Sequence, residues 1–195
     1  MSVIRGTGMD GNVALQRWIL TQALGTGGSH ALGAGVIAEP ACTSRWLSLD
    51  GMLLRIYADA EVRPGAAWQH LQPVQDIAGA SSGQAAAFHY VVETDLAPAH
   101  AQQLTDWYAQ EHLPGLAAVP GTVRARRYLC VDAAMPRSFA CYDLTTPDAL
   151  QSAAWLAVRH TAWSSRVRPL FRNPLRTMFR LAPAAVEPSR TGSPD

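Results

Sequence analysis

Two side chains that can exchange protons, Tyr108 and His112, lie four positions apart in a stretch of helical spacing. Leu104, Trp107 and Tyr108 fit a helix over about 99–113, and residues four apart on a helix share a face. A histidine titrates near neutral pH, so it can give or take the proton that enolisation, cyclisation or isomerisation requires. We therefore predict His112 as the catalytic acid or base and Tyr108 as a hydroxyl that orients the substrate.

The expected end of this helix gives His112 a second interpretation. Pro114 and Gly115 follow it, and a residue before proline is pushed out of the helical region. The carbonyl end of a helix favours a protonated imidazole, so His112 could instead cap the helix through backbone carbonyls. Glu111 is about 100° round the helix and is expected to be solvated or paired with arginine.

Two expected strands carry the candidate binding residues. On strand 122–131, Arg126 and Tyr128 share one face and Arg127 lies on the other. An arginine inside a chamber would bind a carboxylate or enolate oxygen, whereas an outward one would form surface ion pairs. On strand 87–94, His89 alternates with Tyr90 and is a second candidate base. The predicted substrate-binding residues are Arg126, Tyr128, Tyr90, His89 and Trp107.

The second half of the chain predicts the elements that hold these residues. We expect strands at 87–94, 122–131, 138–144 and 176–181, and helices at 99–113 and 147–158. The order β-α-β-β-α-β is the ferredoxin-like motif. Its helices cover one face of the sheet, so the other apolar face must be buried against something else. Two such units stacked face to face would close an α/β barrel.

The first half predicts a blurred version of the same order. Helices are expected at 13–24 and 66–77, a weak strand at 30–38 and a better one at 52–57. This suggests a tandem repeat, with a degenerate ferredoxin-like half at 1–84, a second half at 85–181, and a disordered tail at 182–195. Alternatively the first half is an extension, and two chains pair through their second halves as a homodimer.

One run of motifs carries a family resemblance. Residues 106–114 (DWYAQEHLP) are followed by Val119-Pro120-Gly121 and by Arg124 to Tyr128. This order resembles the dimeric α/β-barrel superfamily, more narrowly its EthD-like and uncharacterised bacterial members, which often have W-Y-x-x-E-H-(I/L)-P and then V-P-G. Residues 166–176 are also similar to the end of that subgroup. The resemblance covers roughly residues 85–181, implies a ferredoxin-like fold with a site near His112, and leaves the reaction open.

Composition excludes several classes of function. The formal net charge is +1, all 16 basic residues are arginines, and charged residues make up 16%, so we expect no nucleic-acid partner. Six arginines and no acidic residue lie between 159 and 180; we expect a packed segment facing acidic partners, or alternatively a phosphate contact. The three cysteines have no metal-ligand spacing, and no leader or membrane span is recognised. We expect a cytoplasmic chain with no metal.

These observations predict an enzyme that transfers protons on a small, oxygen-bearing organic substrate without a cofactor. An EthD-like isomerase, a cyclase, a lyase or a cofactor-free monooxygenase would fit. The alternatives are a non-catalytic barrel for ligand binding or dimerisation, and a haem-binding barrel that uses His112 or His89.

Overall fold

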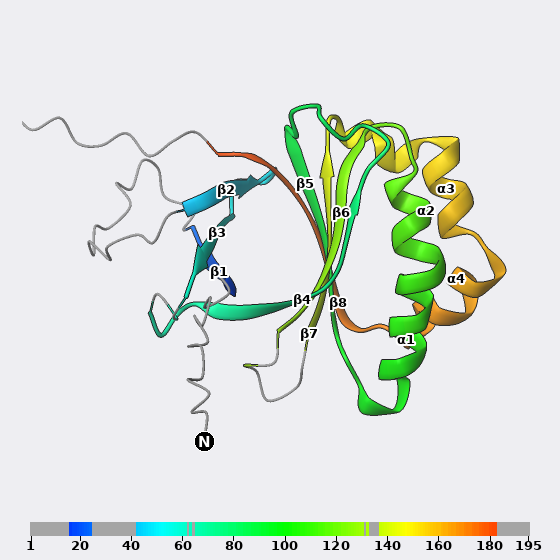
Figure 1. The fold of residues 1–195 in the computed structure, drawn as a ribbon, viewed down its shortest axis with the longest axis horizontal. Coiled ribbons are helices and arrows are strands. Elements are labelled where there is room, and N and C mark those ends of the chain that lie inside the picture. The colour runs from blue at the N-terminus through cyan, green and yellow to red at the C-terminus, as the bar shows by residue number, and fades with distance from the viewer. Residues whose placement is uncertain are drawn as a thin grey trace, which may run out of the picture.

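The computed structural model describes residues 16–24, 42–61, 63, 65–130, 132 and 137–182. Its strands form one closed antiparallel barrel in the order β1–β3–β2–β8–β5–β7–β6–β4, and helices cover one side of it (Figure 1). The strands are β1 Gln16–Ala23, β2 Cys42–Ser48, β3 Leu53–Ala60, β4 Gln69–Ala78, β5 Phe88–Asp95, β6 Thr122–Cys130, β7 Arg137–Leu144 and β8 Arg172–Leu181. The barrel closes within one chain, as one of the two predicted arrangements requires.

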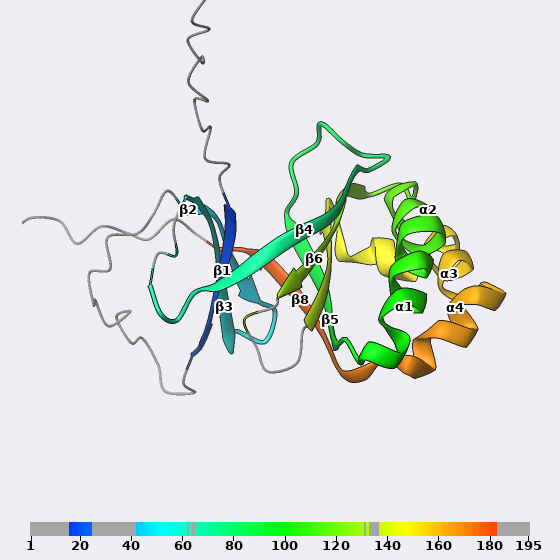
Figure 2. The same ribbon diagram turned by 60° about the horizontal axis from the view of Figure 1, so that its bottom comes forward.

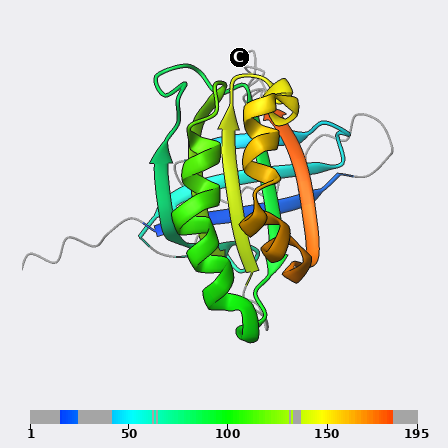
Figure 3. The same cartoon turned by 90° about the vertical axis from the view of Figure 1, so that its right-hand side faces the viewer.

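The second half has the predicted β-α-β-β-α-β order. Its strands pair as β8–β5–β7–β6, and the helical layer lies on the outer face of this sheet (Figure 3). The helical segments are η1 Pro98–His100, α1 Ala101–Trp107, η2 Tyr108–His112, α2 Leu113–Ala117, η3 Pro147–Gln151, α3 Ala153–Arg159, α4 Ala162–Val167 and η4 Arg168–Leu170. The helix expected at 147–158 is divided into η3 and α3, because the Ser152 side chain caps the start of α3. The Thr161 side chain caps α4, which the sequence did not predict.

The first of these helices does not end at Pro114, contrary to the prediction. A π-helical turn, η2, joins α1 to α2, and Pro114 lies in the first turn of α2. Proline has no N–H to donate to the preceding turn, and the wider π turn absorbs that missing bond without breaking the helix. His112 therefore lies in the middle of a helical run rather than at its carbonyl end.

Both helices predicted for the first half are strands. In β1, the consecutive residues Trp18, Ile19 and Leu20 are all buried: Ile19 belongs to one apolar cluster, and Trp18 and Leu20 belong to another. Such a strand lacks the alternation of apolar and polar residues, so its pattern is mistaken for that of a helix. In β4, a bulge between Pro73 and Gln75 shifts the pairing with β6, which disrupts the two-residue period.

The first-half strands take the place of the second unit that the sequence predicted. They cross behind the β5–β8 sheet at a steep angle (Figure 3), and β4 runs from β1 to β6 and so joins the two sheets (Figure 2). Among the described residues the first half has no helix, so a repeated ferredoxin-like unit is not confirmed. The expected strand at 30–38 and the tail beyond residue 182 lie outside the described residues.

The segment between the two halves is a loop that hydrogen bonds hold against the start of β6. Gly79 N–H donates to the Val123 carbonyl at 2.9 Å, and the Ser81 hydroxyl accepts from Gly121 N–H at 2.9 Å. A side chain at position 79 would lie 2.0 Å from the Thr122 carbonyl oxygen, so this close approach requires glycine. Of the helices described, none is long and apolar enough to cross a membrane.

Candidate functional site

Strand β5 divides the predicted site residues between two places. Its side chains alternate, so His89 points into the barrel while Tyr90 points towards the helices. Tyr90, Trp107, Tyr108 and His112 come together between the helices and the sheet. Arg126 and Tyr128 face the barrel interior instead, on the opposite side of the same sheet.

The helix-side cavity is built from aromatic rings. Its aromatic lining consists of Tyr90, Trp107, Tyr108, Tyr142, Trp155 and Phe171. The His112 ring stacks on Trp107 with centroids 4.0 Å apart and meets the edge of Tyr108 at 5.7 Å. The π turn brings these three side chains together, because it contains Tyr108 and His112 and directly follows Trp107.

A hydrogen-bonded support holds Trp107 against His112. The indole N–H of Trp107 donates to the Ser164 hydroxyl at 3.2 Å. Glu111 accepts from the Thr161 hydroxyl at 2.6 Å and so anchors the start of α4. Glu111, which the sequence assigned to the solvated surface or to an arginine, thus helps to fix α4 against the helix that carries His112.

Three arginines, Arg159, Arg168 and Arg176, complete the lining of this cavity, and no acidic residue lines it. None of them has an ion pair with any other described residue. Burial, followed by the nearby Arg159 and Arg176 charges, lowers the pKa of Arg168. A cluster of like charges with no counter-ion is a site where an anion would be stabilised.

His112 is neutral in this environment. Burial, then the charges of Arg168 and Arg159, lower the pKa of His112 from 6.5 to about 3. The protonated helix cap considered from the sequence is therefore wrong: the helix continues past His112, and the nearby charges are positive. Its Nδ1 and the Tyr142 hydroxyl are buried without a hydrogen-bond partner, and both residues line the cavity. Both groups can therefore hydrogen-bond to a ligand that enters the cavity.

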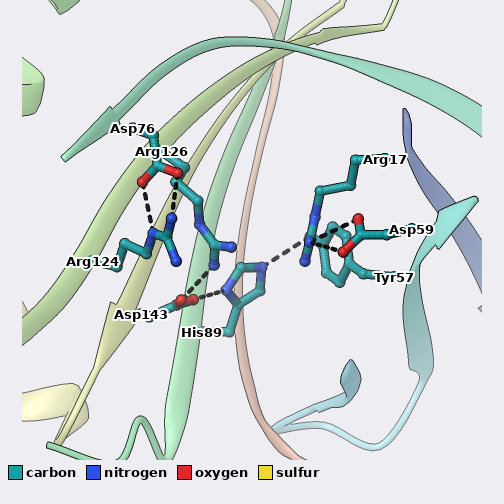
Figure 4. A network of polar contacts seen from close by, with 8 residues as sticks. All are labelled: Arg17, Tyr57, Asp59, Asp76, His89, Arg124, Arg126 and Asp143. Carbon is teal, nitrogen blue, oxygen red and sulfur yellow. Dashed lines mark hydrogen bonds and ion pairs between the residues drawn. The ribbon is translucent and has the colours of Figure 1, made fainter. Parts of the chain in front are cut away.

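A second polar cluster lies inside the barrel (Figure 4). The His89 Nδ1 is 2.7 Å from Asp143, its Nε2 is 2.9 Å from the Tyr57 hydroxyl, and Arg126 forms an ion pair with Asp143. Burial lowers the pKa of His89 despite Asp143. Burial alone would raise the pKa of Asp143, but the His89 hydrogen bond and Arg126 hold it below its usual range. A neutral His89 thus donates through Nδ1 and accepts from Tyr57 through Nε2.

The barrel also has a cavity at its mouth, with a volume of about 320 Å³. Arg17, Asp59, Asp76, Arg124, Arg126 and Tyr128 line it, so its character is polar and charged. The helix-side cavity has a volume of about 30 Å³, which holds roughly one water molecule. The barrel mouth is thus already open to a small ligand, while the helix-side cavity must widen to admit one.

Comparisons with known proteins identify the fold. No family model matches the chain, and no curated protein sequence matches it. A ferredoxin-fold protein of Listeria monocytogenes related to antibiotic biosynthesis monooxygenases superposes with a TM-score of 0.59 and 9% identity, covering 90% of this chain and 100% of that one. A heme-degrading enzyme of Listeria monocytogenes gives 0.56 and 8%, covering 85% and 99%. An anthrone oxidase-like protein gives 0.57 and 9%, covering 88% and 92%.

At these identities the likeness establishes the fold and no more. The chain has a ferredoxin-like α+β fold, as predicted, and these structural neighbours do not support the narrower EthD-like resemblance.

The residues can be tested against the predicted haem alternative. Both ring nitrogens of His89 are engaged, by Asp143 and Tyr57, so His89 does not fit an axial ligand. His112 fits better, because its Nδ1 has no partner and Arg159 and Arg168 lie beside it. Within the described part of the chain, no group of three or more His, Cys, Asp or Glu side chains could hold a metal ion.

Sequence reasoning missed several residues of both cavities. The arginine-rich segment 159–180 was noticed, but it was assigned to an interface with acidic partners rather than to the lining beside His112. The alternative expectation for that segment, contact with phosphates or an acidic ligand, rested on its lack of any acidic residue. Nothing local in the sequence indicated Tyr57 or Asp143, because they lie 32 and 54 positions from His89.

Proposed function

We propose that the helix-side cavity binds a planar, enolisable organic molecule and removes a proton from it. The observation that carries this proposal is the cluster of Arg159, Arg168 and Arg176, which lines an aromatic cavity beside an unpartnered, neutral His112. An enolate or phenolate oxygen would be the anion that these arginines stabilise. The coarse class, a small-molecule protein on a ferredoxin-like fold, agrees with the structural neighbours.

The chemistry divides among three groups of side chains. A ring of the substrate would pack on Trp107 and Phe171, and its carbonyl oxygen would face the arginines. His112 would accept the proton as the C–H bond breaks, while the electron pair moves to the carbonyl oxygen and forms an enolate. Arginines fixed at that oxygen stabilise the charge that develops in the transition state. Tyr108 would orient the substrate. Its own ring is held by a cation–π contact with Arg127, whose guanidinium lies 4.9 Å from the ring centroid.

Ligand binding and His112 are coupled through charge in this scheme. With the cavity unfilled, the pKa of His112 is about 3, which makes the imidazole a weak base. An oxyanion beside Arg159 and Arg168 offsets the two positive charges that contribute to this shift, so it raises the pKa of His112 as it forms. The base therefore becomes stronger when the product charge develops. The arginine side chains must also swing aside, because the cavity of about 30 Å³ is smaller than an aromatic ring system.

Proton exchange on an aromatic ketone tests this proposal directly. Anthrone, incubated with the protein in D₂O, should lose its methylene proton signal in the NMR spectrum faster than in buffer. His112→Gln should slow the protein-dependent exchange by about 100-fold, the lower range for a general base. Arg168→Gln should slow it by about tenfold, and Arg124→Gln, outside this cavity, should leave it unchanged. Exchange that is unaffected by His112→Gln, or no exchange above buffer, would refute the proposal.

Haem binding is a second candidate, favoured by the free Nδ1 of His112. His112 would hold the haem through its Nδ1, and Arg159 and Arg168 would pair with the carboxylates of the haem. The iron would then supply redox chemistry. Adding haem to the purified protein should give a shifted Soret band that His112→Gln abolishes. Absence of a band in the wild type, or a band that persists in the variant, would eliminate this ligand set.

A further inference from the structure

The cavity at the barrel mouth lies on the opposite side of the sheet from the proposed catalytic site. Four strands contribute to it: β1 with Arg17, β3 with Asp59, β4 with Asp76, and β6 with Arg124 and Arg126. Its volume of about 320 Å³ falls within the range typical of small-molecule sites. Arg126 pairs with Asp143 and so connects this cavity to the Asp143–His89–Tyr57 cluster (Figure 4).

The charges of this cavity are ordered from its floor to its rim. Arg126 and Arg17 are the most buried of its arginines, with side chains 12% and 19% exposed. At the rim, Arg124 and Asp76 are 51% and 45% exposed and form a two-point ion pair with distances of 2.6 and 2.5 Å. Asp59, which pairs with Arg17 at 3.2 Å, is 35% exposed. Below the rim each arginine also pairs with an aspartate: Arg17 with Asp59, and Arg126 with Asp143, whose side chain is 13% exposed.

Two hydrogen-bond donors at the floor lack acceptors. The Nε–H groups of Arg17 and Arg126 are buried and unpartnered, although each guanidinium also forms an ion pair with an aspartate. A buried donor without an acceptor costs free energy, so an oxygen anion that accepts from both would be stabilised. The carboxylates of Asp59 and Asp76 are acceptors near the rim, so they favour a ligand that also carries a donor.

We propose that the barrel mouth is a second ligand site, which takes a small organic carboxylate bearing a hydroxyl or ammonium group. The carboxylate would accept from Arg17 and Arg126, and the donor group would bond to Asp59, which lies beside Arg17. This site is independent of the proton transfer proposed at His112, because the β5–β7–β6 sheet separates the two cavities.

Three carboxylates test whether the donor group of the ligand contributes to binding. L-malate carries a hydroxyl, L-glutamate carries an ammonium group, and glutarate carries neither. Isothermal titration at constant ionic strength should show L-malate or L-glutamate binding with a Kd of about 1 mM or tighter, and glutarate binding at least about threefold more weakly. No binding of the first two, or equal binding of all three, would overturn the proposal.

Paired substitutions locate the site while keeping the net charge. Arg17→Gln/Asp59→Asn should weaken binding by at least about tenfold, because it removes one contact to the carboxylate and one to the donor group. Arg124→Gln/Asp76→Asn, at the rim, should weaken it by less than about threefold. Arg168→Gln, in the helix-side cavity, should leave it unchanged; binding lost in this variant would overturn the assignment.

A measurement on the wild-type protein avoids dependence on the folding of the variants. The ¹H–¹⁵N signals of the Arg17 and Arg126 Nε–H groups should shift on addition of the tighter carboxylate, because each gains an acceptor. Saturable shifts at both arginines support the site. Unchanged Nε–H signals at a saturating ligand concentration would overturn it even if calorimetry detects binding.

Discussion

Lowering the pH should destabilise this protein through His112 by an amount that can be calculated. The pKa of His112 is about 3 in the folded chain and 6.5 when exposed, with burial the largest cause and Arg168 and Arg159 next. A group with a depressed folded pKa binds its proton more readily when unfolded, so stability falls as the pH drops below 6.5. Between pH 7 and pH 5 this linkage removes about 2 kcal/mol from the free energy of unfolding.

Urea denaturation at pH 7 and pH 5 measures this quantity. His112→Gln lacks the titrating group, so its free energy of unfolding should fall between the two pH values by about 2 kcal/mol less than that of the wild type. His89 also has a lowered pKa, but its contribution is present in both proteins and cancels in the difference. His112→Asn should give the same difference whatever its own stability. A difference near zero, or an NMR titration of His112 near pH 6.5, would refute this account of its environment.

Two further predictions concern the scaffold. Gly79→Ala should lower the free energy of unfolding, measured by urea titration, by at least about 2 kcal/mol, because the new Cβ would lie 2.0 Å from the Thr122 carbonyl oxygen. The control Gly65→Ala should be near neutral, because its new Cβ makes only an ordinary contact at 3.6 Å. Arg55→Met should cost about 3–5 kcal/mol, since it removes the main ion-pair partner of buried Glu93; Arg55→Met/Glu93→Gln should recover part of this loss in thermal unfolding, and equal losses would contradict the reasoning.

The second half could be predicted because each of its elements has a local signal. Successive side chains of β5 alternate between buried and partly exposed positions for most of its length, and the spacing of Leu104, Trp107 and Tyr108 is helical. The prediction of helices in the first half was wrong for physical reasons. Trp18, Ile19 and Leu20 are buried on both faces of β1, and the β4 bulge at Pro73 interrupts the period of two.

The candidate site shows the same division between local and distant information. His112 and Tyr108 were found because they lie close together in sequence, within one recognisable motif. The unpartnered state of the His112 Nδ1 and the convergence of Arg159, Arg168 and Arg176 depend on how α3, α4 and β8 pack. Pairings such as Tyr57 with His89 require the register of strands far apart in the chain, which periodicity does not encode.

Closure of the barrel within one chain has a consequence for its behaviour on dilution. The inner face of the β5–β8 sheet, through which two chains would pair, is already occupied by β1, β2 and β3. The two layers are covalently linked, so their association is unimolecular and independent of protein concentration. The melting temperature should therefore stay constant over a hundredfold dilution, and any self-association must use a different surface.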